Sequence, residues 1–281
     1  MGNQKNRYRV RLMAMIGCLA LMSLSVQAQS EDSSNADTIA WQSLPFADGE
    51  ELTYKIYYNW GFIWIPAGEV KFSVQEKKDH LQYLITGKTY EAYDAFFKVR
   101  DYYLSEVDKE TLRPNNFRRD ILEGNYVRFD SIVFNQETHA LKEYFGKSRA
   151  EAKEFKFQLE NVVHDMVSVI YHLRKQPVDS YEVGERIPLE IFFDKEFFKL
   201  DVVYKGLTKR RIKNRGKMKV YHLQPELIDG YVFSEGNLMD IWVSNDDLKV
   251  PLQIESPISI GFVKAVLTSV KRNHESVIEK L

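Results

Sequence analysis

The stretch TYKIYYNWGFIWIPAGEVKFSV, residues 53–74, decides the fold that we expect for the rest of the chain. Apolar and polar side chains alternate along residues 53–58 and again along residues 69–74. Because successive side chains of a strand point to opposite faces of a sheet, this period of two predicts two β-strands. Strands so close in sequence, with turn residues between them, are expected to pair in an antiparallel way.

The same alternation recurs farther along the chain. It is found over residues 81–85, 155–159, 187–193 and 198–204. Turn signals occur at Lys77-Lys78-Asp79, Arg113-Pro114-Asn115-Asn116, Glu123-Gly124-Asn125, Asn214-Arg215-Gly216 and Asp229-Gly230. Long helices do not alternate with these strands, which argues against a doubly wound parallel sheet. The sequence therefore predicts a mainly β fold with a strongly curved antiparallel sheet, either a half-barrel or barrel-like.

One segment has the period of a helix instead. In HDMVSVIYHLRKQP, residues 164–177, apolar side chains recur at helical spacing from Met166 to Leu173. Asp165 is placed to cap the first turn, and Pro177 suits the end. Apolar residues cover most of the helix circumference, which is typical of a helix buried on several sides. We expect one buried α-helix near residues 165–175, packed against or plugging the concave face of the sheet.

Residues 1–28 have the pattern of a secretory signal peptide. Four basic residues precede an apolar run and the small-residue pattern Val26-Gln27-Ala28. The apolar run, of about fifteen residues, is shorter than the roughly twenty that cross a bilayer. Cys18 offers an alternative, in which it becomes the lipidated first residue of an anchored protein. Most of the apolar run follows Cys18, which favours ordinary cleavage after Ala28 and an exported protein of the periplasm or outer envelope of a Gram-negative-type cell.

The remaining chain divides into a polar, flexible leader at residues 29–43 and a single β-rich domain at residues 44–275. Removal of residues 1–28 takes four of the 39 basic residues and none of the 40 acidic ones, which leaves a net charge of about −5. Nothing in this mildly acidic balance suggests a nucleic-acid partner. The mature chain would contain no cysteine, so disulfides and cysteine metal sites are not expected.

A set of short motifs resembles the domain of unknown function 3108 family of exported bacterial proteins. The first motifs are Phe46-Ala47-Asp48-Gly49-Glu50, Ala67-Gly68-Glu69, Leu112-Arg113-Pro114 and Phe129-Asp130. The later ones are Asp165-Met166-Val167-Ser168, Ile241-Trp242-Val243-Ser244, Val250-Pro251 and Ala265-Val266-Leu267. Their order covers nearly all of residues 45–270. The resemblance implies an exported, β-rich envelope protein without an established activity, and it supplies no catalytic residues.

Aromatic side chains are the candidates for ligand binding. Between the turn residue Gly61 and the pair Pro66 and Gly68, the chain carries several large apolar groups that need a partner. This partner is the core of the protein, a lipid-like ligand or a membrane, with transient membrane contact in the last case. The proposed ligand-binding residues are Trp60, Phe62, Trp64, Phe96, Phe97 and Tyr102.

A basic run, KGLTKRRIKNRGKMK at residues 205–219, surrounds a predicted turn. On a hairpin, Lys213, Arg215, Lys217 and Lys219 would share one side and attract the phosphate groups of lipids. The alternative is a solvated hairpin whose lysines discourage pairing between sheet edges.

Three residues are assigned structural roles, namely Asp165, Arg174 and Trp242. A charge near a core is normally paired, so Asp165 with Arg174, and Arg100 with Asp101, are expected as buried ion pairs.

Motifs for catalysis and for metal binding are missing from the sequence. The six histidines show no spacing typical of a metal site, and no nucleophile elbow, phosphate-binding loop or dinucleotide fingerprint occurs. We therefore expect no cofactor, no metal and no enzymatic activity. The leading hypothesis is an envelope protein that binds a lipid-like ligand or a lipidated partner in an apolar groove. The alternatives are a structural or assembly partner in the envelope and a hydrolase of envelope glycans.

Overall fold

A computed structural model describes residues 44–60, 62–225, 239–258, 261–272 and 275–276. All strands in this part of the chain belong to one antiparallel sheet, in the order β8-β7-β6-β5-β4-β3-β2-β1-β14-β13-β12-β11-β10-β9, with β15 paired to β14. The strands of the first half are β1 (Glu51–Trp60), β2 (Ile63–Glu76), β3 (His80–Thr89), β4 (Val99–Asp108), β5 (Pro114–Glu123), β6 (Tyr126–Asn135), β7 (Ala140–Gly146) and β8 (Lys153–Gln158). Those of the second half are β9 (Arg186–Phe193), β10 (Glu196–Ile212), β11 (Gly216–Pro225), β12 (Asp240–Ser244), β13 (Pro251–Pro257), β14 (Phe262–Arg272) and β15 (Glu275–Ser276).

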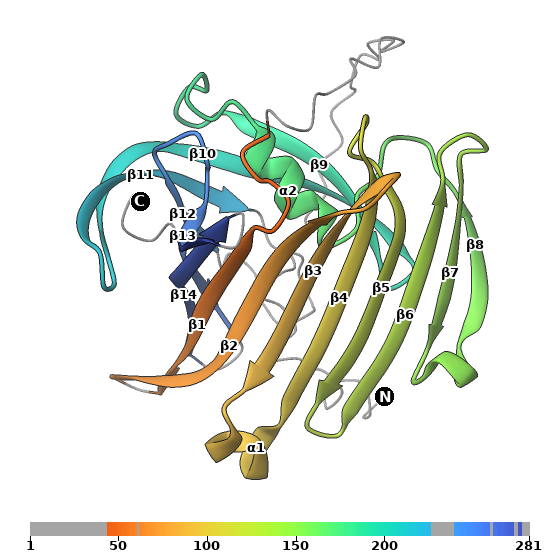
Figure 1. Ribbon diagram of the computed structural model, residues 1–281, viewed down its shortest axis with the longest axis horizontal. Helices are drawn as coiled ribbons and strands as arrows, with labels where there is room; N and C mark the ends of the chain where they lie inside the picture. The colour runs from red at the N-terminus through yellow and green to blue at the C-terminus, as the bar shows by residue number, and fades with distance from the viewer. Residues whose placement is uncertain (1–43, 61, 226–238, 259–260, 273–274, 277–281) are drawn as a thin grey trace, which may run out of the picture.

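The sheet curves strongly without closing. In Figure 1, β1 to β8 cross the front while β9 to β11 arch behind the top, and α2 (Ser168–Lys175) lies within the curve. The end strands β8 and β9 meet through side chains, with the rings of Phe157 and Phe192 4.9 Å apart. On the free side of β9, the N–H group of His164 donates to the carbonyl oxygen of Glu190, and the carbonyl oxygen of His164 accepts from the N–H group of Phe192. The predicted curved, barrel-like antiparallel sheet is confirmed.

The concave side of the sheet and α2 together form the core. Tyr171 of α2 stacks on Tyr83 of β3 with ring centroids 3.9 Å apart, and Phe46 meets both rings edge-on. All three side chains are fully buried. Edge-to-face and offset aromatic pairs stabilise a core beyond their buried area. The helix therefore packs against the concave side, as the sequence predicted.

Several local expectations need correction. The turn expected at Arg113–Asn116 lies earlier, because Pro114 already begins β5. Helix α1 (Glu91–Phe97) was not expected, and it buries none of its residues, so it has no apolar stripe that a periodicity argument detects. Residues 1–28, residues 29–43 and the turn at Asp229-Gly230 lie outside the described residues.

Pro66 and Gly68 mark a bulge within β2 and not the end of a strand. The register between β1 and β2 shifts between Ile56 and Tyr57, which leaves Ala67 as the extra residue. A bulge bends a strand and increases its twist, which contributes to the curvature of the sheet.

Gly68→Ala should destabilise the fold by about 1–3 kcal/mol. A Cβ atom at Gly68 would lie 2.4 Å from the carbonyl oxygen of Lys88, a backbone atom that cannot move aside alone. Gly87→Ala in the adjacent β3 is the matched control, since its Cβ atom would meet only side-chain atoms at 3.7 Å. Urea unfolding of the two variants measures the difference, and equal midpoints would contradict the steric argument.

Candidate functional site

Helix α2 is fixed at its start by a buried carboxylate. Asp165 Oδ1 accepts hydrogen bonds from the backbone N–H groups of Val167 (2.7 Å) and Ser168 (2.9 Å). Its other oxygen accepts one from the hydroxyl of Ser105 on β4 at 2.6 Å. Burial raises the pKa of Asp165, although these donors act in the opposite direction. Asp165 thus holds the turn before the helix and ties it to the sheet, whereas the N-cap position of α2 is Val167, which makes no side-chain cap hydrogen bond.

The end of α2 is fixed by a buried ion pair. Arg174 Nη1 lies 2.5 Å from Glu50 Oε1, and Arg174 Nη2 lies 3.1 Å from Glu50 Oε2. The same Nη2 donates to the carbonyl oxygens of Pro45 and Leu248, both at 3.0 Å. Burial opposes the guanidinium charge, but Glu50 outweighs it and raises the pKa of Arg174. The partner of Arg174 is therefore Glu50, which corrects the expected pair with Asp165; likewise Arg100 pairs with Asp94 and not with Asp101.

Between α2 and the sheet lies a largely apolar cavity of about 70 Å³. Helix α2 contributes Ile170 and Leu173 to its wall, and the facing strands contribute Phe72, Leu223 and Ile254. Protein interiors contain few voids larger than a water molecule, so an apolar cavity of this size is unusual. Such cavities stay dry and accept apolar guests.

Charged and polar groups lie at one part of this cavity. Lys249 lines it and adopts a left-handed backbone conformation with φ 47°. Asp246 builds this turn, since its Oδ1 accepts the N–H groups of Leu248 (3.0 Å) and Lys249 (3.2 Å). The Nζ atom of Lys249 lies 3.6 Å from Asp179 and 4.6 Å from the centre of the Tyr221 ring. A cation therefore stands beside an apolar wall, which suits a molecule with an acidic head and an apolar tail.

A second feature of the concave side is a cluster of carboxyl groups around Arg119. Asp130 lies 2.8 Å from Arg119 Nη2, which also pairs with Asp194. Burial, and then the nearby charge of Asp130, raise the pKa of Glu143 to about 9. We name Arg119, Asp130, Glu143 and Asp194 the acidic cluster. Because Arg119, Asp130 and Glu143 are buried, the cluster is mostly part of the packed interior.

Asp101 and Glu123 form a second acidic pair on the same side of the sheet. Burial, and then the charge of Glu123, raise the pKa of Asp101 to about 8. The sequence analysis named Asp101 only as a partner of Arg100 and did not bring it together with Glu123, because the two residues lie on different strands whose order it did not establish.

The predicted ligand-binding residues do not line the cavity. Phe62 and Trp64 lie at the β1–β2 hairpin, Phe96 and Phe97 lie on α1, and Tyr102 borders an open groove of about 630 Å³. The backbone of Trp60 ends β1, but its side chain is outside the described part. The six positions are thus spread along the surface and do not converge on a single site.

The predicted anion-binding residues lie on the β10–β11 hairpin and divide between two environments. Lys217 and Lys219 are exposed, whereas Arg215 is half-buried and its pKa is lowered by burial. Lys213 Nζ lies 3.7 Å from the centre of the Tyr57 ring. Lys213 is exposed as well, so of the four residues only Arg215 is partly covered by its surroundings.

Trp242 is buried and connects this hairpin to the rest of the sheet. Its ring stacks with His222 at 5.4 Å, and the guanidinium of Arg210 lies 4.0 Å from its centre. This position suits the structural role that the sequence assigned to it.

The described residues contain no group of three or more histidine, cysteine or acidic side chains able to hold a metal. His164 and His172 are in contact, with ring centroids 4.5 Å apart. Burial lowers their pKa values to about 3 and about 4. In the part of the chain that the structure describes, no helix is long and apolar enough to span a membrane.

The fold and the cavity define a class of protein with an open, curved antiparallel sheet around a buried helix. The chain belongs to the family described as protein of unknown function (DUF3108), whose model matches residues 53–268. This confirms the resemblance noted in the sequence. No curated protein matches the chain.

The solved structures that resemble this one include two uncharacterised proteins. The first is a β-barrel-like protein of domain of unknown function DUF1849 from Brucella abortus, with 8% identity, a TM-score of 0.53, and coverage of 79% of this chain and 96% of the other. The second is a candidate exported protein with a YmcC-like fold from Bacteroides fragilis NCTC 9343, with 9% identity, a TM-score of 0.30, and coverage of 82% and 98%. At such identity, the first supports the barrel-like fold alone.

Proposed function

We propose that this chain is an exported protein of the cell envelope that binds an amphiphile, either a lipid-like molecule or the lipid group of a partner. The observation that carries the proposal is the apolar cavity beneath α2 with Lys249 at its wall. The apolar lining favours an acyl chain, and the ammonium group favours a carboxylate or phosphate head. Residues 1–28, with the pattern of a signal peptide, support export.

The size of the cavity limits what it holds. A cavity of about 150 Å³ accommodates a benzene molecule. The cavity beneath α2, at about 70 Å³, is half as large, so it holds the end of an acyl chain and not a whole lipid. The remainder of the ligand then lies outside the cavity, near Lys249.

The proposal is one of binding and involves no catalytic step. A glycan hydrolase needs two carboxyl groups that flank a substrate in a cleft. The described carboxyl groups with the most strongly raised pKa values, Asp101, Asp130, Asp165 and Glu143, are buried among core side chains. This burial favours the binding role over hydrolysis.

Native mass spectrometry of the full chain, purified from its own envelope, should reveal a bound acyl amphiphile. Leu223→Phe should abolish the adduct, because the larger ring occupies the cavity that Leu223 lines. Val133→Phe, an exposed position on β6 outside the cavity, is the matched control and should retain it. A wild-type protein without any amphiphile, or an equal adduct in Leu223→Phe, would refute the proposal.

A further inference from the structure

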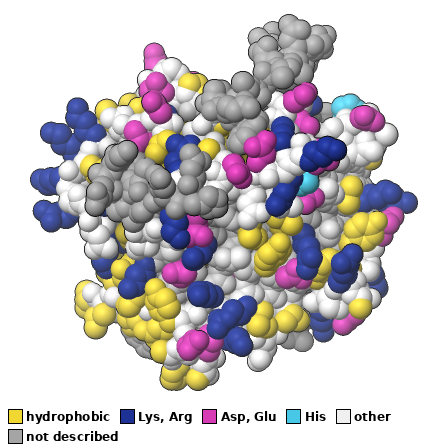
Figure 2. All heavy atoms as spheres, viewed as in Figure 1, with side chains coloured by type: hydrophobic (Ala, Val, Ile, Leu, Met, Phe, Trp, Pro, Cys, Tyr) yellow, Lys and Arg dark blue, Asp and Glu magenta, His cyan; other side chains and the backbone are white. Residues whose placement is uncertain are grey.

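Apolar side chains project from the lower end of the sheet, where β1 meets β2 and β14 begins. Phe62 is fully exposed, and Ile63 and Phe262 expose 66% and 50% of their surface. We name these three residues the aromatic tip. Tyr58 pairs with Val263 across β1 and β14, which places the start of β14 beside the β1–β2 hairpin. Figure 2 shows a corresponding group of hydrophobic side chains at the lower left of the molecule.

Basic side chains gather on the neighbouring β10–β11 hairpin. Residues 205–220 contain eight lysines and arginines and no acidic residue. Lys209 lies opposite Lys219 and Arg211 opposite Lys217, so like charges face each other across the hairpin. Directly opposed like charges are destabilising unless an anion compensates them. Among the described residues these four form no ion pair, and we name them the basic hairpin.

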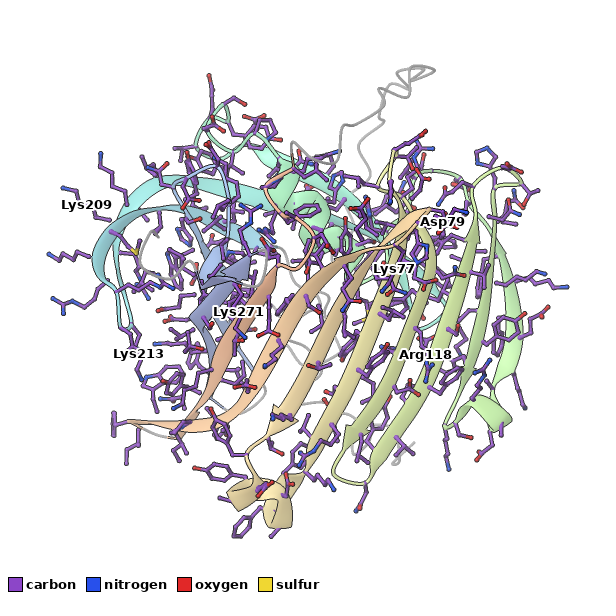
Figure 3. The ribbon with its side chains drawn as sticks, in the orientation of Figure 1. Lys77, Asp79, Arg118, Lys209, Lys213 and Lys271 are labelled. Carbon is purple, nitrogen blue, oxygen red and sulfur yellow. The ribbon has the colours of Figure 1, made fainter. Side chains whose placement is uncertain are left out.

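The aromatic tip and the basic hairpin lie on one side of the molecule. Lys213, in the hairpin turn, is 3.7 Å from the ring of Tyr57 on β1. Figure 3 places Lys213 just above the β1–β2 hairpin and Lys209 farther up the same left side. On β14, Lys264 Nζ lies 4.1 Å from the ring of Trp64, behind the aromatic tip. Exposed aromatic groups thus stand next to a surface of positive charge.

The opposite end of the sheet has a different character. The β2–β3 turn consists of Lys77, Lys78 and Asp79, and Figure 3 places two of them at the upper side. The β4–β5 turn likewise contains Lys109 and Glu110. Hairpin turns by themselves therefore do not explain the apolar residues of the aromatic tip.

We propose that the aromatic tip and the basic hairpin together dock this protein onto an anionic lipid surface. Aromatic and large aliphatic groups insert at the boundary between head groups and acyl chains, while lysines and arginines attract the lipid phosphates. A surface without acidic residues over residues 205–220 suits a negatively charged bilayer better than a neutral one. Docking uses a surface separate from the cavity beneath α2.

Vesicle flotation of the full chain tests this inference. The wild type should float with vesicles that contain phosphatidylglycerol and not with pure phosphatidylcholine, and binding should weaken with salt. Phe62→Ser with Phe262→Ser should weaken binding about tenfold or more, by loss of apolar insertion. Arg211→Glu with Lys217→Glu should weaken it about 20-fold or more, since each basic group near an anionic surface contributes about fivefold.

Two matched controls exclude general effects of substitution. Val183→Ser removes another exposed apolar side chain, and Lys142→Glu with Lys153→Glu reverses two exposed charges on β7 and β8. These variants should bind vesicles as the wild type does, and so should Leu223→Phe, which separates docking from the cavity. Absence of flotation overturns the inference, and so does flotation that the tip and hairpin variants leave unchanged. A third outcome is that the wild type does not bind vesicles but self-associates, and that Phe62→Ser abolishes this self-association. This outcome would overturn the inference and assign the surface to contact with a second copy of the chain.

Discussion

Arg174→Ala is expected to lower the free energy of unfolding by about 3–5 kcal/mol. The substitution leaves the carboxylate of Glu50 buried without its bidentate partner, at a site where Glu50 is only 1% exposed. It also leaves the carbonyl oxygens of Pro45 and Leu248 without this donor. Chemical denaturation monitored by tryptophan fluorescence measures the change.

A double substitution shows how much of the lost stability comes from leaving the charge of Glu50 buried without a partner. Arg174→Met with Glu50→Leu removes both charges together and should recover much of the stability, because apolar replacements of a buried pair are often tolerated. Arg100→Ala, which breaks the more exposed pair with Asp94, should cost no more than about 1 kcal/mol. Equal costs for Arg174→Ala and Arg100→Ala would refute the structural role of the Glu50 pair.

The free energy of unfolding is expected to fall by on the order of 2 kcal/mol between pH 6.5 and 8. Asp101 and Glu143 have pKa values of about 8 and about 9 in the folded protein, against ordinary values of 3.8 and 4.5. In this range the folded state holds protons that the unfolded chain releases, so stability decreases as pH rises. Equilibrium unfolding at a series of pH values measures the slope.

The buried histidines determine how the free energy of unfolding changes toward acid pH. The pKa values of His164 and His172 are lowered from 6.5 to about 3 and about 4, so below pH 6.5 the unfolded chain binds protons that the folded protein does not. Stability therefore also falls toward acid, and its maximum is expected between about pH 4.5 and 6.5.

Two variants test the expected decrease of stability above pH 6.5. Glu143→Gln should flatten the decrease above pH 6.5 and raise stability at pH 8, because it removes a carboxyl group that resists ionisation. Glu106→Gln, on the partly exposed side of β4, should leave the slope unchanged. A wild type that is as stable at pH 8 as at pH 6.5 would disprove the effect of these carboxyl groups.

The sequence predicted the fold better than the site. Alternation along residues 53–58, 69–74 and 187–193 identified strands because apolar side chains that point toward the core recur with a period of about two, although β1 and β9 also bury Tyr57 and Phe192 between them. The helix near residues 165–175 was found for the same reason, since its apolar residues recur at helical spacing. Helix α1 was missed because it buries no residue, and so leaves no periodic signal.

The contacts that fix the site are non-local, and spacing does not reveal them. Glu50 and Arg174 are 124 residues apart, and Ser105 and Asp165 are 60 apart. The sequence identified Arg174 and Asp165 as charges near a core, but it paired them with each other because they are near in sequence. Choosing the true partners requires the strand order, which a pattern of alternation does not provide.

The strand order has a consequence for how the chain folds. Strands β1 to β8 form one continuous meander and β9 to β14 another, so each half pairs mainly with its neighbours in sequence. The two halves are joined in the sheet by β1 and β14, where Glu51 lies opposite Lys271. Loop closure over such a distance is entropically costly and slows folding. Completion of the sheet must therefore wait until β14 has left the ribosome and can pair with β1.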